Sequence, residues 1–206
     1  MSDHELPLFP LEVVLFPESG IALHIFEKRY KVLINECLTE GKEFGINLVH
    51  GGGMSAVGCS ARVKQVVKRY PDGKLDIIVE GSRRYKLLRL ERRKTPYAVG
   101  SVEYLHDESE AIDDALAVKT LDLYRQLVEM VYEGTKKVPA PENVMTGLSF
   151  RMGEKAGLDL AQRQQLLELS SENERLKLLE RYLMSIIPRL QRREEVDRIS
   201  HNDGYL

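Results

Sequence analysis

Histidines are the most versatile of the side chains in this 206-residue chain that could bind a metal or move a proton. The five of them are His4, His24, His50, His106 and His201. They are widely scattered, they form no His-x-x-x-His pair, and none is close in sequence to a cysteine. Metal sites usually show such short spacings. The sequence therefore predicts no metal site.

Cysteines and neighbouring acids are the other groups that could take part in catalysis. Cys37 and Cys59 could form one disulfide, but two cysteines without a secretion signal are more often reduced and buried. Paired acids such as Asp113 and Asp114 diverge around a helix axis, which favours two solvated carboxylates over an acid and base pair. We expect neither cysteine nor acid pair to be catalytic, and we expect no cofactor.

Sequence motifs for nucleotide binding and acyl transfer are missing. There is no G-x-x-x-x-G-K-[ST] phosphate loop and no G-x-S-x-G nucleophile turn. The glycine run at 51–53 precedes strand-like sequence, so no helix N-terminus supports its amides, and we interpret it as a connecting loop. Cys59 lies in a strand-like segment, where packing in the core is the simpler role.

A basic segment from Arg62 to Lys94 contains 12 Lys and Arg against 4 Asp and Glu. With Tyr85 and Tyr97 available for stacking, such a segment could bind RNA. The candidate RNA-binding residues are Arg83, Arg84, Lys86, Arg89, Arg92, Arg93 and Lys94. The simpler alternative is a solvated sheet face, because side chains along a strand alternate between two faces. We favour the solvated face and keep RNA binding as the alternative.

The composition of the whole chain excludes several other classes of protein. A net charge of -2 gives no overall attraction to nucleic acid or anionic lipid, and 43% hydrophobic residues suffice for a core. The longest uncharged stretches, such as 19–26, are too short to cross a bilayer. The first residues are acidic, unlike a secretion signal, so we expect a cytoplasmic protein with no membrane partner.

The pattern of apolar residues changes near residue 106. Residues 1–106 are rich in Val, Ile, Gly and Pro and predict six or seven short strands forming a small closed or half-closed barrel. One amphipathic helix over 26–38, stopped by Gly41, is expected inside this part. The sequence Pro71-Asp72-Gly73 indicates a hairpin turn. Residues 107–206 predict a separate helical part.

Capping boxes indicate where the helices of the second part begin. The pairs are Asp107 with Glu110, Asp159 with Gln162, and Ser171 with Glu174. The first helix is expected to run to about Glu133, followed by a break at residues 139–141. Pro188 is expected to kink or end the last helix, because proline lacks the amide hydrogen, and the tail beyond it is expected to fray.

Several segments of the chain form a recognisable set: Leu6-Pro7-Leu8-Phe9-Pro10-Leu11, Val14-Leu15-Phe16-Pro17, Leu23-His24-Ile25-Phe26-Glu27-Lys28-Arg29-Tyr30, Phe44-Gly45-Ile46, Val57-Gly58-Cys59-Ser60-Ala61, Tyr70-Pro71-Asp72-Gly73 and Val79-Glu80-Gly81-Ser82-Arg83-Arg84-Tyr85. Taken together, they resemble the N-terminal, substrate-binding domain family of Lon proteases. The resemblance spans about residues 5–187. It implies an α+β fold, a PUA-like β pseudo-barrel with one inserted helix followed by a C-terminal helical bundle.

The resemblance also implies a non-catalytic module that binds unfolded or client polypeptides, with a protease or chaperone as a further partner. Lon proteases continue into ATPase and Ser-Lys peptidase domains, and neither is expected in this chain, so catalysis is not carried over. A binding module needs an exposed apolar patch. The candidate polypeptide-binding residues are Leu8, Phe9, Phe16 and Met54.

Other residues of the resemblance are expected to maintain the fold. The residues expected to set backbone geometry are Pro10, Pro17, Gly45, Gly58 and Gly81. Phe26 and Tyr30 are expected to close the helix onto the barrel. A third hypothesis, an unrecognised enzyme with a ligand site between the two parts, has only the expected domain boundary in its favour.

Overall fold

The computed structural model describes residues 4–131 and 147–202, with side chains described up to residue 192. The chain divides into two compact units. Unit 1 comprises Met1–Asp107 and Leu158–Ser170, and unit 2 comprises Glu108–Gly157 and Ser171–Leu206. The expected division into 1–106 and 107–206 differs from this arrangement, because residues 158–170 return to the first unit.

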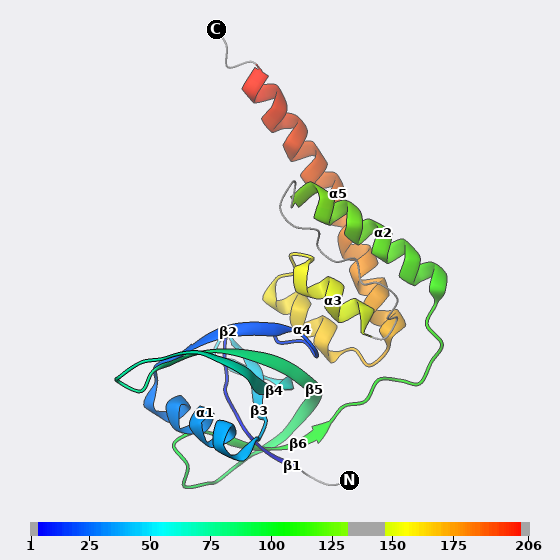
Figure 1. Cartoon of the computed structure of the whole chain (residues 1–206). Helices are drawn as coiled ribbons and strands as arrows, with labels where there is room; N and C mark the ends of the chain where they lie inside the picture. The colour runs from blue at the N-terminus through cyan, green and yellow to red at the C-terminus, as the bar shows by residue number, and fades with distance from the viewer. Residues whose placement is uncertain (1–3, 132–146, 203–206) are drawn as a thin grey trace. The chain divides into compact units, whose positions relative to one another are not determined.

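Unit 1 is built on an antiparallel sheet whose strands are β1 (His4–Pro7), β2 (Gly20–Ile25), β3 (Phe44–His50), β4 (Gly53–Arg69), β5 (Leu75–Glu91) and β6 (Val99–Tyr104) (Figure 1). Their order is β1-β6-β5-β4-β3, and β2 also pairs with β5. Because β5 is 17 residues long, it pairs with β2 through Leu75–Glu80 and with β6 through Tyr85–Glu91. The turn between β4 and β5 contains Gly73 at φ 79°, so the hairpin prediction is confirmed.

Helix α1 (Lys28–Glu40) packs its apolar face into the core of unit 1. Its buried residues are Tyr30, Leu33, Ile34 and Cys37, and it ends at Gly41 with φ 65°, as the sequence predicts. Tyr30 stacks on Phe9 at 4.0 Å between ring centroids. Phe26 does not help to close this helix. Its side chain is 59% exposed, so that expectation is wrong.

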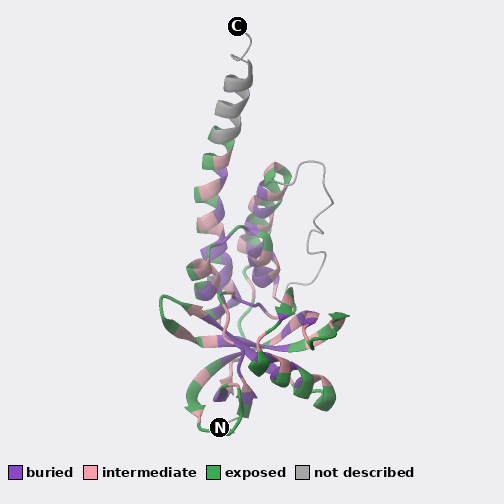
Figure 2. Cartoon of the chain, turned by 90° about the vertical axis from the view of Figure 1, so that its left-hand side faces the viewer, coloured by how far each residue is buried: buried purple, intermediate pink, exposed green. Residues whose placement is uncertain are grey.

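Several glycines of unit 1 are required by space rather than by an unusual φ angle, among them Gly45, Gly58 and Gly81. A Cβ atom at Gly45 would lie 2.2 Å from the Oη atom of Tyr85, and one at Gly81 would lie 2.1 Å from the carbonyl oxygen of Phe16. Tyr85 is fully buried and donates a hydrogen bond to the side-chain oxygen of Asn47. The colouring in Figure 2 shows buried residues along the middle of the strands and exposed residues toward their ends.

Helix α4 (Leu160–Glu168) belongs to unit 1. It begins at Asp159, whose side chain accepts a hydrogen bond from the amide of Gln162 while the Gln162 side chain accepts one from the Asp159 amide. The predicted capping box is therefore confirmed. Arg163 of this helix donates to the carbonyl of Val14 and lies over the ring of Phe16, which holds α4 on the sheet unit.

Unit 2 consists of α2 (Asp114–Val131), α3 (Leu148–Lys155) and α5 (Glu172–Asn202) within the described residues. Helix α2 starts later than its predicted box at Asp107, because Asp113 caps it by accepting from the Leu116 amide. Ser171 caps α5 by accepting from the Glu174 amide. Helix α5 continues through Pro188, so the helix does not end there, and both Pro188 and Met184 one turn earlier are exposed. The expected helix end near Glu133 and the break at 139–141 lie outside the described residues.

Candidate functional site

The apolar residues nominated from the sequence for polypeptide binding do not form an exposed patch. Leu8, Phe9 and Phe16 are buried, and Met54 is half-buried against the cluster around Tyr85. The segment that holds the first three runs against β3, where the Phe9 amide donates to the carbonyl of Gly45. Their apolar side chains therefore enter the core, and the expectation that they are exposed is wrong.

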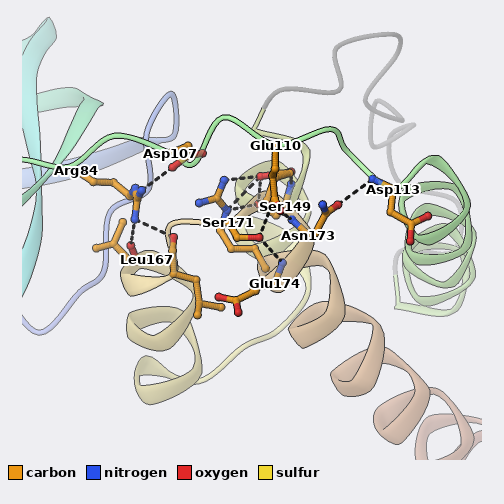
Figure 3. Close-up of polar contacts among 12 residues, drawn as sticks. Arg84, Asp107, Glu110, Asp113, Ser149, Leu167, Ser171, Asn173 and Glu174 are labelled. Carbon is orange, nitrogen blue, oxygen red and sulfur yellow. Dashed lines mark hydrogen bonds and ion pairs between the residues drawn. The ribbon is translucent and has the colours of Figure 1, made fainter.

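Arg84, nominated for RNA binding, is a structural residue. Its side chain is only 3% exposed, and it donates to the carbonyls of Leu167 and Leu169 at 2.9 and 2.8 Å and to the carboxylate of Asp107 (Figure 3). The two carbonyls belong to the C-terminal end of α4, which carries free acceptors and partial negative charge. Arg84 thus attaches α4 to β5 and offers no charge to a phosphate.

The other basic residues of this segment are exposed, but several have acidic neighbours. Arg89 pairs with Glu91 at 2.9 Å, and Arg93 pairs with Glu5. Arg83 lies over the ring of Tyr104 at 3.6 Å and is 4.0 Å from Glu43. Lys86, Arg92 and Lys94 are also exposed. Ion pairs therefore partly neutralise this basic surface. Arg84 does not belong to it, because its side chain is buried.

A cluster of three rings that the sequence did not reveal lies at the end of β2 and just beyond β4; His24 and Phe26 are exposed and Tyr70 is half-buried. The rings of His24 and Phe26 are nearly parallel with centroids 5.9 Å apart, and Tyr70 meets His24 edge-on at 5.9 Å. Phe26 faces outward because side chains alternate and its neighbour Ile25 is buried. The paired register of His24 with Asp76 is the signal that could have located this cluster, but register is not visible in the sequence.

Polar contacts hold these rings in place. His24 Nδ1 lies 2.6 Å from one Asp76 oxygen, and the Tyr70 hydroxyl donates to the other at 2.7 Å. These hydrogen bonds, from His24 first and then Tyr70, lower the pKa of Asp76, while the same bond to Asp76 raises the pKa of Tyr70. Lys68 lies 4.5 Å above the Tyr70 ring. We call His24, Phe26, Lys68, Tyr70 and Asp76 the outer aromatic surface.

The cysteines of unit 1 are buried and are not nucleophiles in the folded chain. Both thiols are free. Burial raises the pKa of Cys37 to about 11 and that of Cys59 to about 12. Both therefore stay protonated near neutral pH, and the thiolate is the reactive form.

A polar cluster in unit 2 combines a serine, a glutamate and an arginine. Ser149 donates to Glu172 through both its amide and its hydroxyl at 2.8 Å, and Arg175 pairs with Glu172 at 2.6 Å. Arg175 also lies over the ring of Phe150. All these groups are buried, so they join α3 to α5 rather than meet a substrate. At the start of α5, the Ser171 hydroxyl and the Asn173 backbone amide both donate to the Glu110 carboxylate (Figure 3).

Across the part of the chain that the structure describes, no group of three or more His, Cys, Asp or Glu side chains is arranged to hold a metal ion. None of the described helices has the length and apolar character needed to cross a membrane.

Residues 5–185 match the family model of the ATP-dependent protease La (LON) substrate-binding domain. The chain therefore belongs to this family, and its fold is a mixed α/β fold with an antiparallel sheet and helices. The crystal structure of a Lon N-terminal domain protein from Xanthomonas campestris superposes with a TM-score of 0.68 at 28% identity, over 85% of this chain and 96% of that one. The N-terminal domain of Mycobacterium avium complex Lon protease gives 0.64 at 20% identity, over 88% and 98%, and shows the shared fold.

Curated relatives are longer proteins. Lon protease 1 of Hydrogenovibrio crunogenus is 21% identical over 90% of this chain, and Lon protease of Xanthomonas oryzae pv. oryzae is 27% identical over 85%. The chain spans only 24% and 22% of their lengths. The match thus covers the substrate-binding domain region of these relatives.

Proposed function

We propose that this chain is a non-catalytic module that binds unfolded or client polypeptides in the cytoplasm, with a protease or chaperone as a further partner. Membership of the substrate-binding domain family supports this function. The proposal includes a PUA-like pseudo-barrel for unit 1 and a helical bundle for unit 2. The observation that carries it is the outer aromatic surface, a group of rings of which His24 and Phe26 are exposed, in a domain of this family.

The chemistry of the outer aromatic surface suits polypeptide segments. Unfolded chains expose apolar side chains, and aromatic residues dominate the energetics of protein interfaces. Phe26 presents an apolar ring, while His24 and Tyr70 combine ring faces with polar atoms. Because Asp76 fixes both of these rings, little side-chain freedom would be lost on binding.

Titration of a labelled unfolded polypeptide tests the proposal. We would follow the fluorescence anisotropy of fluorescein-labelled, reduced and carboxymethylated α-lactalbumin as the full chain is added. We expect Phe26→Ser to weaken binding at least about fivefold, because hot-spot rings contribute more than 1 kcal/mol. The matched control is Met184→Ser, since Met184 is 53% exposed on α5 of unit 2. Equal binding by both variants and the wild type would contradict the role of the surface.

RNA binding through the exposed basic residues remains the second candidate, and the observation in its favour is that exposed Arg83 lies over the ring of Tyr104. Phosphate contacts make affinity fall steeply with salt, whereas apolar contacts respond little. The same titration at low and high salt, with single-stranded RNA as competitor, separates the two. Salt-sensitive binding that RNA displaces and that Arg83→Ala weakens would favour the RNA function.

A further inference from the structure

Among the described strands of unit 1, two edges that lack a neighbouring strand are built differently. Beyond Ala61, β4 has no partner on the side of β3, so Arg62–Arg69 form one edge. Strand β2 pairs only with β5 among the described strands, so Gly20–Ile25 form the other. An edge strand presents unpaired N–H and C=O groups that another extended chain can bind.

The β4 edge carries the features that prevent such pairing. It contains Arg62, Lys64, Lys68 and Arg69, and its ladder with β5 is interrupted by bulges at 63–65 and 66–68. Basic side chains and bulges are the usual means by which proteins protect an edge. Strand β2 has neither. Its sequence, Gly-Ile-Ala-Leu-His-Ile, contains no lysine, arginine, acid or proline, and its register with β5 is unbroken over all six residues.

The backbone groups that β2 turns outward can be assigned from its ladder. The Gly81 amide donates to the Ser19 carbonyl at 2.9 Å, and Gly20 stands opposite Glu80. Antiparallel pairing then alternates, so Gly20, Ala22 and His24 direct their N–H and C=O groups away from β5. Among the described residues, these N–H groups have no backbone acceptor and these C=O groups have no backbone donor. Another extended backbone offers partners at the spacing of this row, about 7 Å between alternate residues.

We propose that the free edge of β2 binds an extended segment of an unfolded polypeptide as an additional strand, through main-chain hydrogen bonds. The inference rests on the proposed function and specifies its mode. Main-chain bonding accepts many sequences, while the side chains of the added strand give selectivity. Phe26 and His24 of the outer aromatic surface lie at the end of this edge and would contact the added side chains.

Charge identifies the preferred occupant. Between residues 62 and 80, β4, β5 and the turn between them carry Arg62, Lys64, Lys68, Arg69 and Lys74 against Asp72, Asp76 and Glu80. Arg62 and Lys64 pair with Glu80, and Lys74 pairs with Asp72, so a net charge of +2 remains. A second copy of this chain would bring the same positive excess. A client segment that alternates apolar and acidic residues would bring a charge opposite to this excess. We therefore assign the edge to apolar segments bearing carboxylates.

Amide hydrogen exchange tests the mode directly in the full wild-type chain. With reduced, carboxymethylated α-lactalbumin bound, we expect exchange at the amides of Ala22 and His24 to slow at least about tenfold, because these groups become hydrogen-bonded. Binding that leaves both amides unprotected overturns the edge inference while leaving polypeptide binding intact. Absence of binding by the wild-type chain instead overturns the proposed function.

The variant Ala22→Pro removes one outward N–H without removing a bond to β5, a position where an edge strand tolerates proline. We expect about tenfold weaker probe binding, while the control Ala22→Ser, which keeps the N–H, stays within about twofold of wild type.

An eight-residue peptide of alternating valine and glutamate should bind more tightly than one of valine and lysine, and equal binding would overturn the charge assignment. Dimerisation in sedimentation experiments that Ala22→Pro abolishes and the probe does not displace would overturn the inference in favour of a second copy.

Discussion

His24 and Asp76 face each other across strands β2 and β5, with the imidazole Nδ1 atom 2.6 Å from the carboxylate. Asp76 also accepts from Tyr70, so one carboxylate connects β2, β5 and the hairpin after β4. The outer aromatic surface and the free edge of β2 therefore share a single polar anchor. A change at Asp76 should alter the order of the rings without entering the core.

Acid should weaken this anchor. The pKa of Asp76 is lowered in the folded chain by its bonds to His24 and Tyr70, so the unfolded chain takes up the proton at higher pH. Its contribution to stability is therefore complete above about pH 5 and is lost as the pH falls through the lowered folded pKa, below about pH 4. The difference in free energy of unfolding between wild type and Asp76→Asn should shrink over this range in urea titrations. Glu129→Gln, at an exposed position of α2, is the control, and an Asp76 difference that does not change with pH would contradict the assignment.

Replacement of Arg84 should release α4 from the sheet. In Arg84→Met the carbonyls of Leu167 and Leu169 lose their donors, and we expect a loss of about 2–4 kcal/mol in the free energy of unfolding. Arg84→Lys should recover little, because one ammonium lacks the planar fork that reaches several acceptors. Chemical denaturation followed by circular dichroism measures both variants. The exposed neighbour Arg83→Met should lose less than about 1 kcal/mol, and a similar loss at both positions would argue against a special role for Arg84.

Gly45 and Tyr85 should show coupled stability effects. Gly45→Ala places a methyl group 2.2 Å from the Tyr85 hydroxyl and should lower stability by at least about 2 kcal/mol. Tyr85→Phe leaves the Asn47 oxygen without its donor and should cost about 1–3 kcal/mol. In the double variant the hydroxyl is gone, so its loss should be smaller than the sum, although the ring carbon and Leu6 remain close. Simple additivity in a double-mutant cycle would contradict this close contact.

The two thiols should resist alkylation in the folded chain. With a pKa of about 11, Cys37 is about one-thousandth thiolate at pH 8, and Cys59, with a pKa of about 12, still less. We expect iodoacetamide to label neither cysteine within the time that labels both in denaturant, with Cys37 the faster of the two on long exposure. Intact-mass spectrometry provides the measurement. Rapid labelling of Cys59 under native conditions would show that the core of unit 1 opens readily.

Features set by neighbouring residues could be predicted from the sequence. The capping box of Asp159 with Gln162, the hairpin turn at Gly73 and the apolar face of α1 depend on spacings of a few residues, and all three occur in the structure. Pro188 was misjudged because its rule assumes that the carbonyl one turn earlier needs an internal donor. At this exposed position of α5 water can supply that bond.

Features that depend on distant residues could not be predicted. The sequence does not show whether an apolar side chain in a proline-rich segment is buried, so Phe16 was expected at the surface and Phe26 against the core, the reverse of the structure. Arg84 was assigned to a basic surface because its acceptors lie more than 80 residues away in the chain. The free edge of β2 likewise follows from strand order, which no local pattern encodes.

The return of residues 158–170 to unit 1 has a consequence for the order in which the protein is made. A growing chain that has reached residue 107 holds every strand of the sheet but lacks α4 and the carbonyls that Arg84 binds. The guanidinium must stay hydrated, or find other acceptors, until the segment beyond residue 157 has left the ribosome. Completion of unit 1 during synthesis is therefore delayed by the passage of the intervening helices, and a circular permutant that begins at residue 158 would remove this delay because α4 would then be made before the sheet.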